Sequence, residues 1–138
     1  MGRKIILTVG VIVVALAAVF LLGPRVSTDT TITFDPGTIG NDPDAWLASQ
    51  EGRFDDLRGG LQKEIIWAYP ASKARTPVSI VYVHGFSASR GEVAPLPELV
   101  GAELGANVFY TRLAGHGRSG KAMTEGSVNA WVNDFAVA

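Results

Sequence analysis

The feature that most constrains this chain is an apolar run near its N-terminus. Residues 5–22 carry no charged side chain, and Arg3 and Lys4 precede them. A helix of this length covers about 27 Å, close to the hydrocarbon thickness of a bilayer. A helix buried in a soluble protein usually keeps a polar stripe, whereas this run offers only Thr8 and Gly10. The sequence therefore predicts that residues 1–23 form a transmembrane anchor.

A cleaved signal peptide is the alternative interpretation of this segment. The apolar region of a signal peptide normally has about 7–15 residues, with small residues at a cleavage site just after it. The pattern Ala15-Leu16-Ala17 is the only one of this kind, and it lies inside the run. Positive charge before the run exceeds that of the lone Arg25 beyond it. We therefore expect a single-pass membrane protein with a cytoplasmic N-terminus and an exported domain, periplasmic or extracellular.

Composition excludes several classes of function. The 12 basic and 13 acidic residues give a net charge of −1 without a basic patch, so nucleic acid is not an expected partner. The absence of cysteine excludes disulfides, thiolate chemistry and cysteine-based zinc sites. The only two histidines, His84 and His116, are too few for an all-histidine catalytic metal site. No metal and no cofactor are expected.

Residues 24–61 are predicted to form a linker and a short helix. The linker is polar to about residue 40 and favours a short strand over residues 30–34. Asp42 suits an N-cap, with Pro43 at the first helical position, and the helix should end near Gly52.

Residues 62–138 are predicted to form part of an α/β domain. Strands are expected over residues 62–69, 78–83 and 107–111, and helices are expected from about 95 to 105 and from Ser127 onward. The run 78–83 is almost entirely apolar, which is typical of a strand buried on both faces. Two strands joined by a helix predict parallel pairing. The first of these helices carries Leu96, Leu99, Val100 and Leu104 at helical spacing.

Two glycine-containing turns follow the predicted strands. In open α/β sheets, functional sites form at the carboxyl ends of the strands. The first turn is His84-Gly85-Phe86-Ser87, and the second is Gly115-His116-Gly117-Arg118-Ser119-Gly120. These two turns contain the candidate site residues of the chain.

The order and spacing of these turns resemble the start of an α/β-hydrolase. The similarity covers residues 62–138 and is greatest to the lysophospholipase, monoacylglycerol-lipase and serine-aminopeptidase-like branch. It implies an α/β fold, the N-terminal part of a hydrolase sheet, preceded here by one transmembrane helix. It also implies that the backbone N–H of Phe86 forms half of an oxyanion hole, while Gly85 lets the chain turn close to the substrate. His84 would be a structural hydrogen-bonding residue, and Gly115, His116, Gly117 and Ser119 would pack beneath the site.

The nucleophile of this family lies on a Gly-x-Ser-x-Gly elbow. Gly117-Arg118-Ser119 begins such a match, but Lys121 stands where the last glycine should be. In the family's chain order the elbow, the acid and the histidine follow the next strand, and we expect them beyond Ala138. The chain is thus expected to be the N-terminal portion of a membrane-anchored serine hydrolase of esters, lipid-like esters or amides, and inactive alone. A non-catalytic membrane-tethered α/β module, either truncated or a pseudoenzyme, is the alternative.

Other interpretations of the same residues are weaker. A Ser119–His116 dyad lacks an orienting carboxylate in the sequence nearby. The pattern Gly115-x-Gly117-x-x-Gly120, with Asp134 further on, matches a dinucleotide fingerprint, but that motif must open directly into a long helix. The segment from Ser89 to Glu92 fits a capping box, which we prefer to a catalytic Glu92.

Two further expectations concern structure. Arg112 and Arg118 are expected to be surface or structural ion-pair partners. A sheet of so few strands should leave an unpaired edge and an uncovered apolar helix face, so residues 23–138 alone should aggregate or be poorly ordered.

Overall fold

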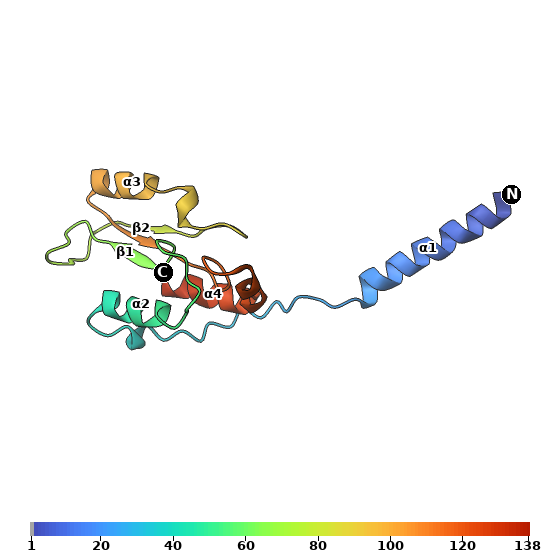
Figure 1. The fold of residues 1–138 in the computed structure, drawn as a ribbon, viewed down its shortest axis with the longest axis horizontal. Coiled ribbons are helices and arrows are strands. Elements are labelled where there is room, and N and C mark those ends of the chain that lie inside the picture. Colours follow the sequence, from blue (N-terminus) through green and yellow to red (C-terminus); the bar gives the residue numbers. More distant parts are fainter. Residues whose placement is uncertain (1) are drawn as a thin grey trace.

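The protein consists of an isolated N-terminal helix, an extended linker and a small α/β unit (Figure 1). The structure, a computed structural model, describes residues 2–138. Helix α1 (Gly2–Leu22) has no buried residue. It is long and apolar enough to cross a membrane. The predicted N-terminal apolar helix is confirmed in this respect.

The sheet is mixed and has three strands in the order β1 (Glu64–Ile66), β3 (Asn107–Tyr110), β2 (Ser79–Tyr82). Strand β2 pairs parallel to β3, and β1 pairs antiparallel to β3 on its other side. The predicted parallel pair is therefore confirmed. Strand β1 is shorter than the predicted 62–69.

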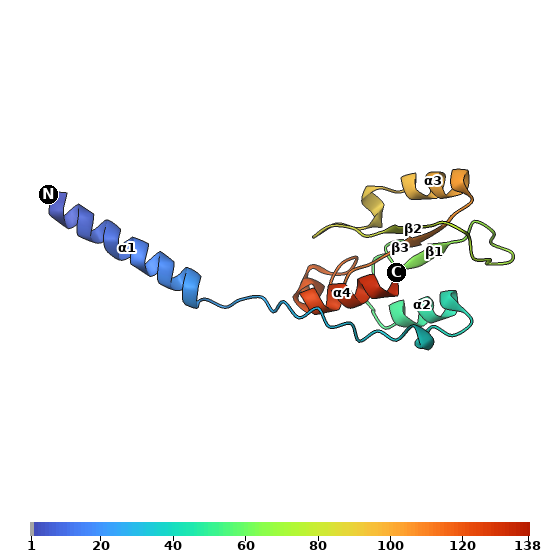
Figure 2. The same cartoon turned by 180° about the vertical axis from the view of Figure 1, so that it is seen from behind.

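Helices cover both faces of the sheet, with α3 on one face and α2 and α4 on the other (Figures 1 and 2). The longer helices are α2 (Pro43–Glu51), α3 (Leu96–Leu104) and α4 (Val128–Val137). Short 3-10 helices span Pro36–Thr38, Arg90–Glu92 and Gly120–Glu125. The predicted caps are confirmed: Asp42 accepts from the Ala45 N–H at 3.1 Å, and Ser127 accepts from the Ala130 N–H at 3.1 Å.

Helix α3 lies close to the sheet through a glycine. A Cβ on Gly101 would stand 2.5 Å from Val108 Cγ2 and 3.1 Å from the Ala106 carbonyl oxygen, so a side chain there would push the helix away. The apolar ridge of α3 points elsewhere. Its members are 42–64% exposed, namely Leu96, Leu99, Val100 and Leu104. This face of α3 has no cover within the described chain.

Strand β2 is not buried on both faces, so that prediction was wrong. Val81 is 42% exposed and Val83, just beyond the strand, is 37% exposed. The strand is at the edge of the sheet, and none of the described residues pairs with its outer side. A run of β-branched residues predicts a strand, but its burial depends on which neighbours are present.

Residues 30–34 do not form the predicted strand. They run extended along α4, and side-chain amides take the place of a neighbouring strand. Asn133 Oδ1 accepts from the N–H groups of Thr33 (2.8 Å) and Phe34 (3.0 Å), while Asn133 Nδ2 donates to the Thr31 carbonyl at 3.0 Å. Asn129 Nδ2 donates to the same carbonyl at 2.9 Å. The linker is thus fastened to α4.

Candidate functional site

The candidate site lies where the loops after β2 and β3 meet. A cleft of about 230 Å³ opens between these loops. Its lining comes from both loops and from the segments beside them, and includes Arg58, Leu61, Ser87, Glu92, His116 and Ser119. The structure therefore brings together the two glycine-containing turns that the sequence singled out.

Two buried histidines join the loops reciprocally. His84, in the loop after β2, accepts the Leu113 N–H on Nε2 at 3.1 Å. His116, in the loop after β3, accepts the Ser87 N–H on Nε2 at 3.0 Å. The rings lie 4.8 Å apart between centroids. We call this pair the histidine clasp.

The clasp defines the tautomer of both rings. An Nε2 atom that accepts an amide N–H carries no proton, so the ring proton lies on Nδ1. The two Nδ1 atoms lie 3.0 Å from the Gly85 carbonyl oxygen and 3.1 Å from the Ala114 carbonyl oxygen, and donate to them. Burial lowers the pKa of His84, which favours the neutral ring that this geometry requires.

Phe86 is a largely exposed residue of the candidate site. The residue is 74% exposed, so its ring is not part of the core. It lies edge-on to His116 and to Trp131, with centroids 6.1 and 6.3 Å away. Within residues 2–138 the Phe86 N–H has no hydrogen-bond partner, whereas the next N–H, that of Ser87, is held by the clasp. The Phe86 N–H is thus free to donate to another group.

The second turn requires glycine at two positions. Gly115 and Gly117 have φ of +82° and +67°. A Cβ on Gly115 would lie 2.7 Å from the Ala122 carbonyl oxygen, and one on Gly117 would lie 3.2 Å from the Leu61 carbonyl oxygen. The glycines therefore pack against the chain itself.

The dinucleotide interpretation finds no support in this geometry. The segment after the turn is the 3-10 helix Gly120–Glu125, whereas the motif needs a long α-helix. Asp134 is occupied, since it pairs with Lys63 Nζ at 2.5 Å and accepts the Ala114 N–H at 2.6 Å.

Ser119 and His116 do not form a dyad. Ser119 Oγ donates to Asp56 Oδ2 at 2.6 Å, and its N–H approaches the same oxygen at 3.3 Å. Hydrogen bonds from Ser119 and Arg118 lower the pKa of Asp56. Because a serine that donates to an ionised carboxylate is held away from the clasp, Ser119 orders the turn. Asp56 lies in a loop whose sequence gave no sign of this contact.

The two arginines of the second loop have structural roles, as expected. Arg112 is buried and forms a two-point ion pair with Glu51, with Nε–Oε2 at 2.6 Å and Nη2–Oε1 at 2.9 Å. Arg118 pairs with Asp56 at 2.7 Å and with Glu125 at 2.5 Å. Sequence analysis missed Glu51, the last residue of α2, because a charged residue at a helix end ordinarily faces water.

The predicted capping box over Ser89–Glu92 is confirmed in part. Ser89 caps the 3-10 helix Arg90–Glu92 and accepts the Gly91 N–H at 3.3 Å. Glu92 itself lines the cleft.

Comparison of the chain with protein-family models, with curated proteins and with solved structures found no match. The arrangement presents a free backbone N–H beside a cleft, and of the serine and histidine side chains that line this cleft, Ser89, Ser119 and His116 are engaged in structural hydrogen bonds. Such a site suits the stabilisation of negative charge on oxygen, and it requires a nucleophile from elsewhere.

Proposed function

We propose that this chain is the N-terminal portion of a membrane-anchored serine hydrolase that cleaves carboxylic esters, with lipid-like esters preferred and amides as the related class. The observation that carries the proposal is the unpartnered N–H of Phe86 at the carboxyl end of β2. The histidine clasp supports it by holding the next amide of the loop.

In the reaction, an activated serine attacks the substrate carbonyl carbon and passes its proton to a base. The carbon–oxygen π electrons move onto oxygen, which becomes negatively charged in the tetrahedral intermediate. The Phe86 N–H donates to that oxygen. Because the clasp already fixes the loop, this donation costs little reorganisation. Collapse of the intermediate expels the alcohol of an ester, or the amine of an amide, which takes the proton back from the base. Water then attacks the acyl-serine by the same steps, and this releases the acid and restores the serine.

The membrane part of the proposal concerns α1. This helix would span the bilayer once, with Arg3 and Lys4 on the cytoplasmic side and the α/β unit exported. The substrate preference follows from combining a membrane anchor with a site for acyl transfer.

The first test is the coding sequence after Ala138. A Gly-x-Ser-x-Gly elbow followed by an aspartate and a histidine supports the hydrolase, and a stop codon contradicts it. In the protein so completed, Phe86→Pro removes the N–H and should lower kcat by about 10²–10³. The matched control Phe86→Leu keeps the N–H and should retain most of the rate.

A second candidate is a membrane-tethered module without catalysis. The engagement of Ser119 by Asp56 and of His116 by Ser87 favours it. The 138-residue chain treated with a fluorophosphonate should remain unlabelled under both proposals. Labelling of Ser119 would contradict both, because it would reveal a nucleophile that the hydrogen bonds do not allow.

A further inference from the structure

The point where the linker meets the α/β unit lies close to the candidate site. Asn129 and Asn133 of α4 hold the linker at Thr31. Trp131, between them on the same helix, lies against the Phe86 ring and donates from Nε1 to the Ala114 carbonyl at 3.0 Å. The linker and the exposed phenylalanine therefore flank one helix, roughly 10–12 Å across with its side chains.

The linker is too short to let the unit move far from α1. Residues 23–30 separate the end of α1 from the fastened Thr31. At about 3.3–3.6 Å per residue, this segment spans at most about 29 Å. The polar headgroup layer on each side of a bilayer is itself roughly 5–8 Å thick. Phe86 can therefore reach the headgroup layer while the linker is less than fully extended.

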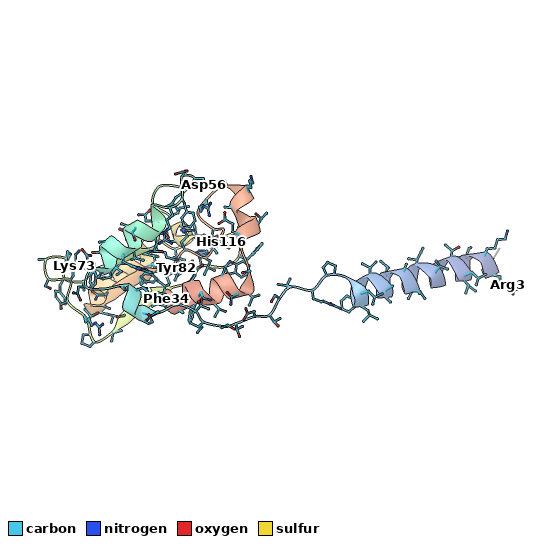
Figure 3. All side chains as sticks on the ribbon, turned by 90° about the horizontal axis from the view of Figure 1, so that it is seen from below. Arg3, Phe34, Asp56, Lys73, Tyr82 and His116 are labelled. Carbon is cyan, nitrogen blue, oxygen red and sulfur yellow. The ribbon has the colours of Figure 1, made fainter. Side chains whose placement is uncertain are left out.

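The orientation of the unit favours the same contact. The ribbon views place the loops after β2 and β3 at the end of the unit nearer α1, and the loop between β1 and β2 at the far end (Figures 1 and 2). Figure 3 agrees, since His116 lies toward α1 and Lys73 lies at the opposite end. The site thus opens on the side from which the anchor arrives.

The exposed side chains at this end suit a lipid surface. Phe86 is 74% exposed, and Leu96, at the start of α3, is 60% exposed. Large apolar side chains of this kind enter the boundary between headgroups and acyl chains, where apolar area is buried. The Phe86 ring also lies edge-on to the rings of His116 and Trp131.

We propose that Phe86 docks into the headgroup region of the membrane that α1 spans, so that the cleft receives its substrate from the bilayer. The substrate would then be an ester that resides in the membrane. The substrate part rests on the proposed hydrolase function, whereas the docking part rests on the linker, the orientation and the exposed ring.

Site-directed spin labelling of the full chain in phosphatidylcholine vesicles tests the docking. The chain contains no cysteine, so Ser87→Cys carries a single nitroxide beside Phe86 and retains the N–H that His116 holds. Ala71→Cys, in the exposed loop at the far end, is the matched control. Collisions with oxygen, relative to those with a water-soluble nickel complex, should be more frequent at position 87 than at position 71. Adding Phe86→Asp should abolish the difference.

Equal collision ratios at the two positions would overturn the docking proposal. So would a ratio at position 87 that rises with the protein-to-lipid ratio, because a second copy and not the bilayer would then cover the ring. These outcomes are independent of catalysis. Docking without an elbow in the coding sequence would leave a membrane-docking module, and an elbow without docking would leave a hydrolase that takes its substrate from water.

Discussion

The buried ion pair between Glu51 and Arg112 offers the sharpest test of how the site is assembled. It joins the end of α2 to the loop after β3, and both side chains are almost fully buried, at 6% and 4% exposed. Glu51→Gln keeps the volume and removes the negative charge. Arg112 would then keep its bond to the His116 carbonyl, at 3.2 Å, and its contact with the Phe54 ring.

The expected loss follows from the burial. Removing one partner of a buried pair leaves an uncompensated charge in a poorly solvated place, at a cost of about 3–5 kcal/mol. The retained bond to the His116 carbonyl places Glu51→Gln near the lower end of that range. The double variant Glu51→Met with Arg112→Met removes both charges, and should be more stable than either single change.

Urea unfolding of the full chain in detergent micelles, followed by tryptophan fluorescence, measures the loss. Trp46 lies on α2, the helix that ends at Glu51, and reports on its release. The control is Lys73→Met, which breaks the exposed pair between Lys73 and Asp44. It should leave the free energy of unfolding unchanged within error, because solvent screens such pairs.

A loss below about 1 kcal/mol for Glu51→Gln would refute the reasoning, since the pair would then behave like a surface pair. A double variant less stable than both single variants would refute it too. That result would mean that the intact ion pair stabilises the fold by more than the single unpaired charge destabilises it in either single variant.

Three further predictions concern other parts of the molecule. Burial lowers the pKa of His84 below its ordinary 6.5, so the unfolded chain binds a proton more readily than the folded one. The midpoint of thermal unfolding should therefore fall as the pH drops below about 6.5. In the variant His84→Gln, the midpoint should depend less on pH over this range. Asn133→Ala should speed hydrogen exchange of the Thr33 amide by about fivefold, because a net hydrogen bond is worth about 1 kcal/mol; unchanged exchange would show that the linker is held otherwise. Residues 23–138 without α1 should self-associate in analytical ultracentrifugation, and Leu99→Asp should reduce the association, since Leu99 is 64% exposed; a monomer that unfolds cooperatively would contradict the role of this face.

Local patterns were enough to predict most of the secondary structure. Asp42 with Pro43, and Ser127 before an apolar run, mark helix starts through hydrogen bonds made within a few residues. The apolar run that became α1 is equally local, because helix length and hydropathy are summed along the chain. The β-strand positions followed from runs of β-branched residues, although β1 proved shorter than expected.

The candidate site was foreseen in its residues but not in its connections. The two glycine-containing turns were singled out, and the structure places them side by side, because the ends of parallel strands meet at one edge of the sheet. Which group each histidine holds was not foreseen. Each of these bonds joins a histidine to an amide 29 residues away in the sequence. The spacing of residue types along the chain does not predict which histidine holds which amide.

Short-range chemistry in the sequence accounts for the apolar N-terminal helix, the caps, the strand positions and the glycines that left-handed turns require. Contacts between distant segments settled the rest: the burial of Glu51 against Arg112, the fastening of the linker by Asn133, and the exposure of β2 at a sheet edge. The physical reason is that propensities and caps depend on neighbours along the chain. Burial and the pairing of charges depend on neighbours in space, and only the folded chain brings those together.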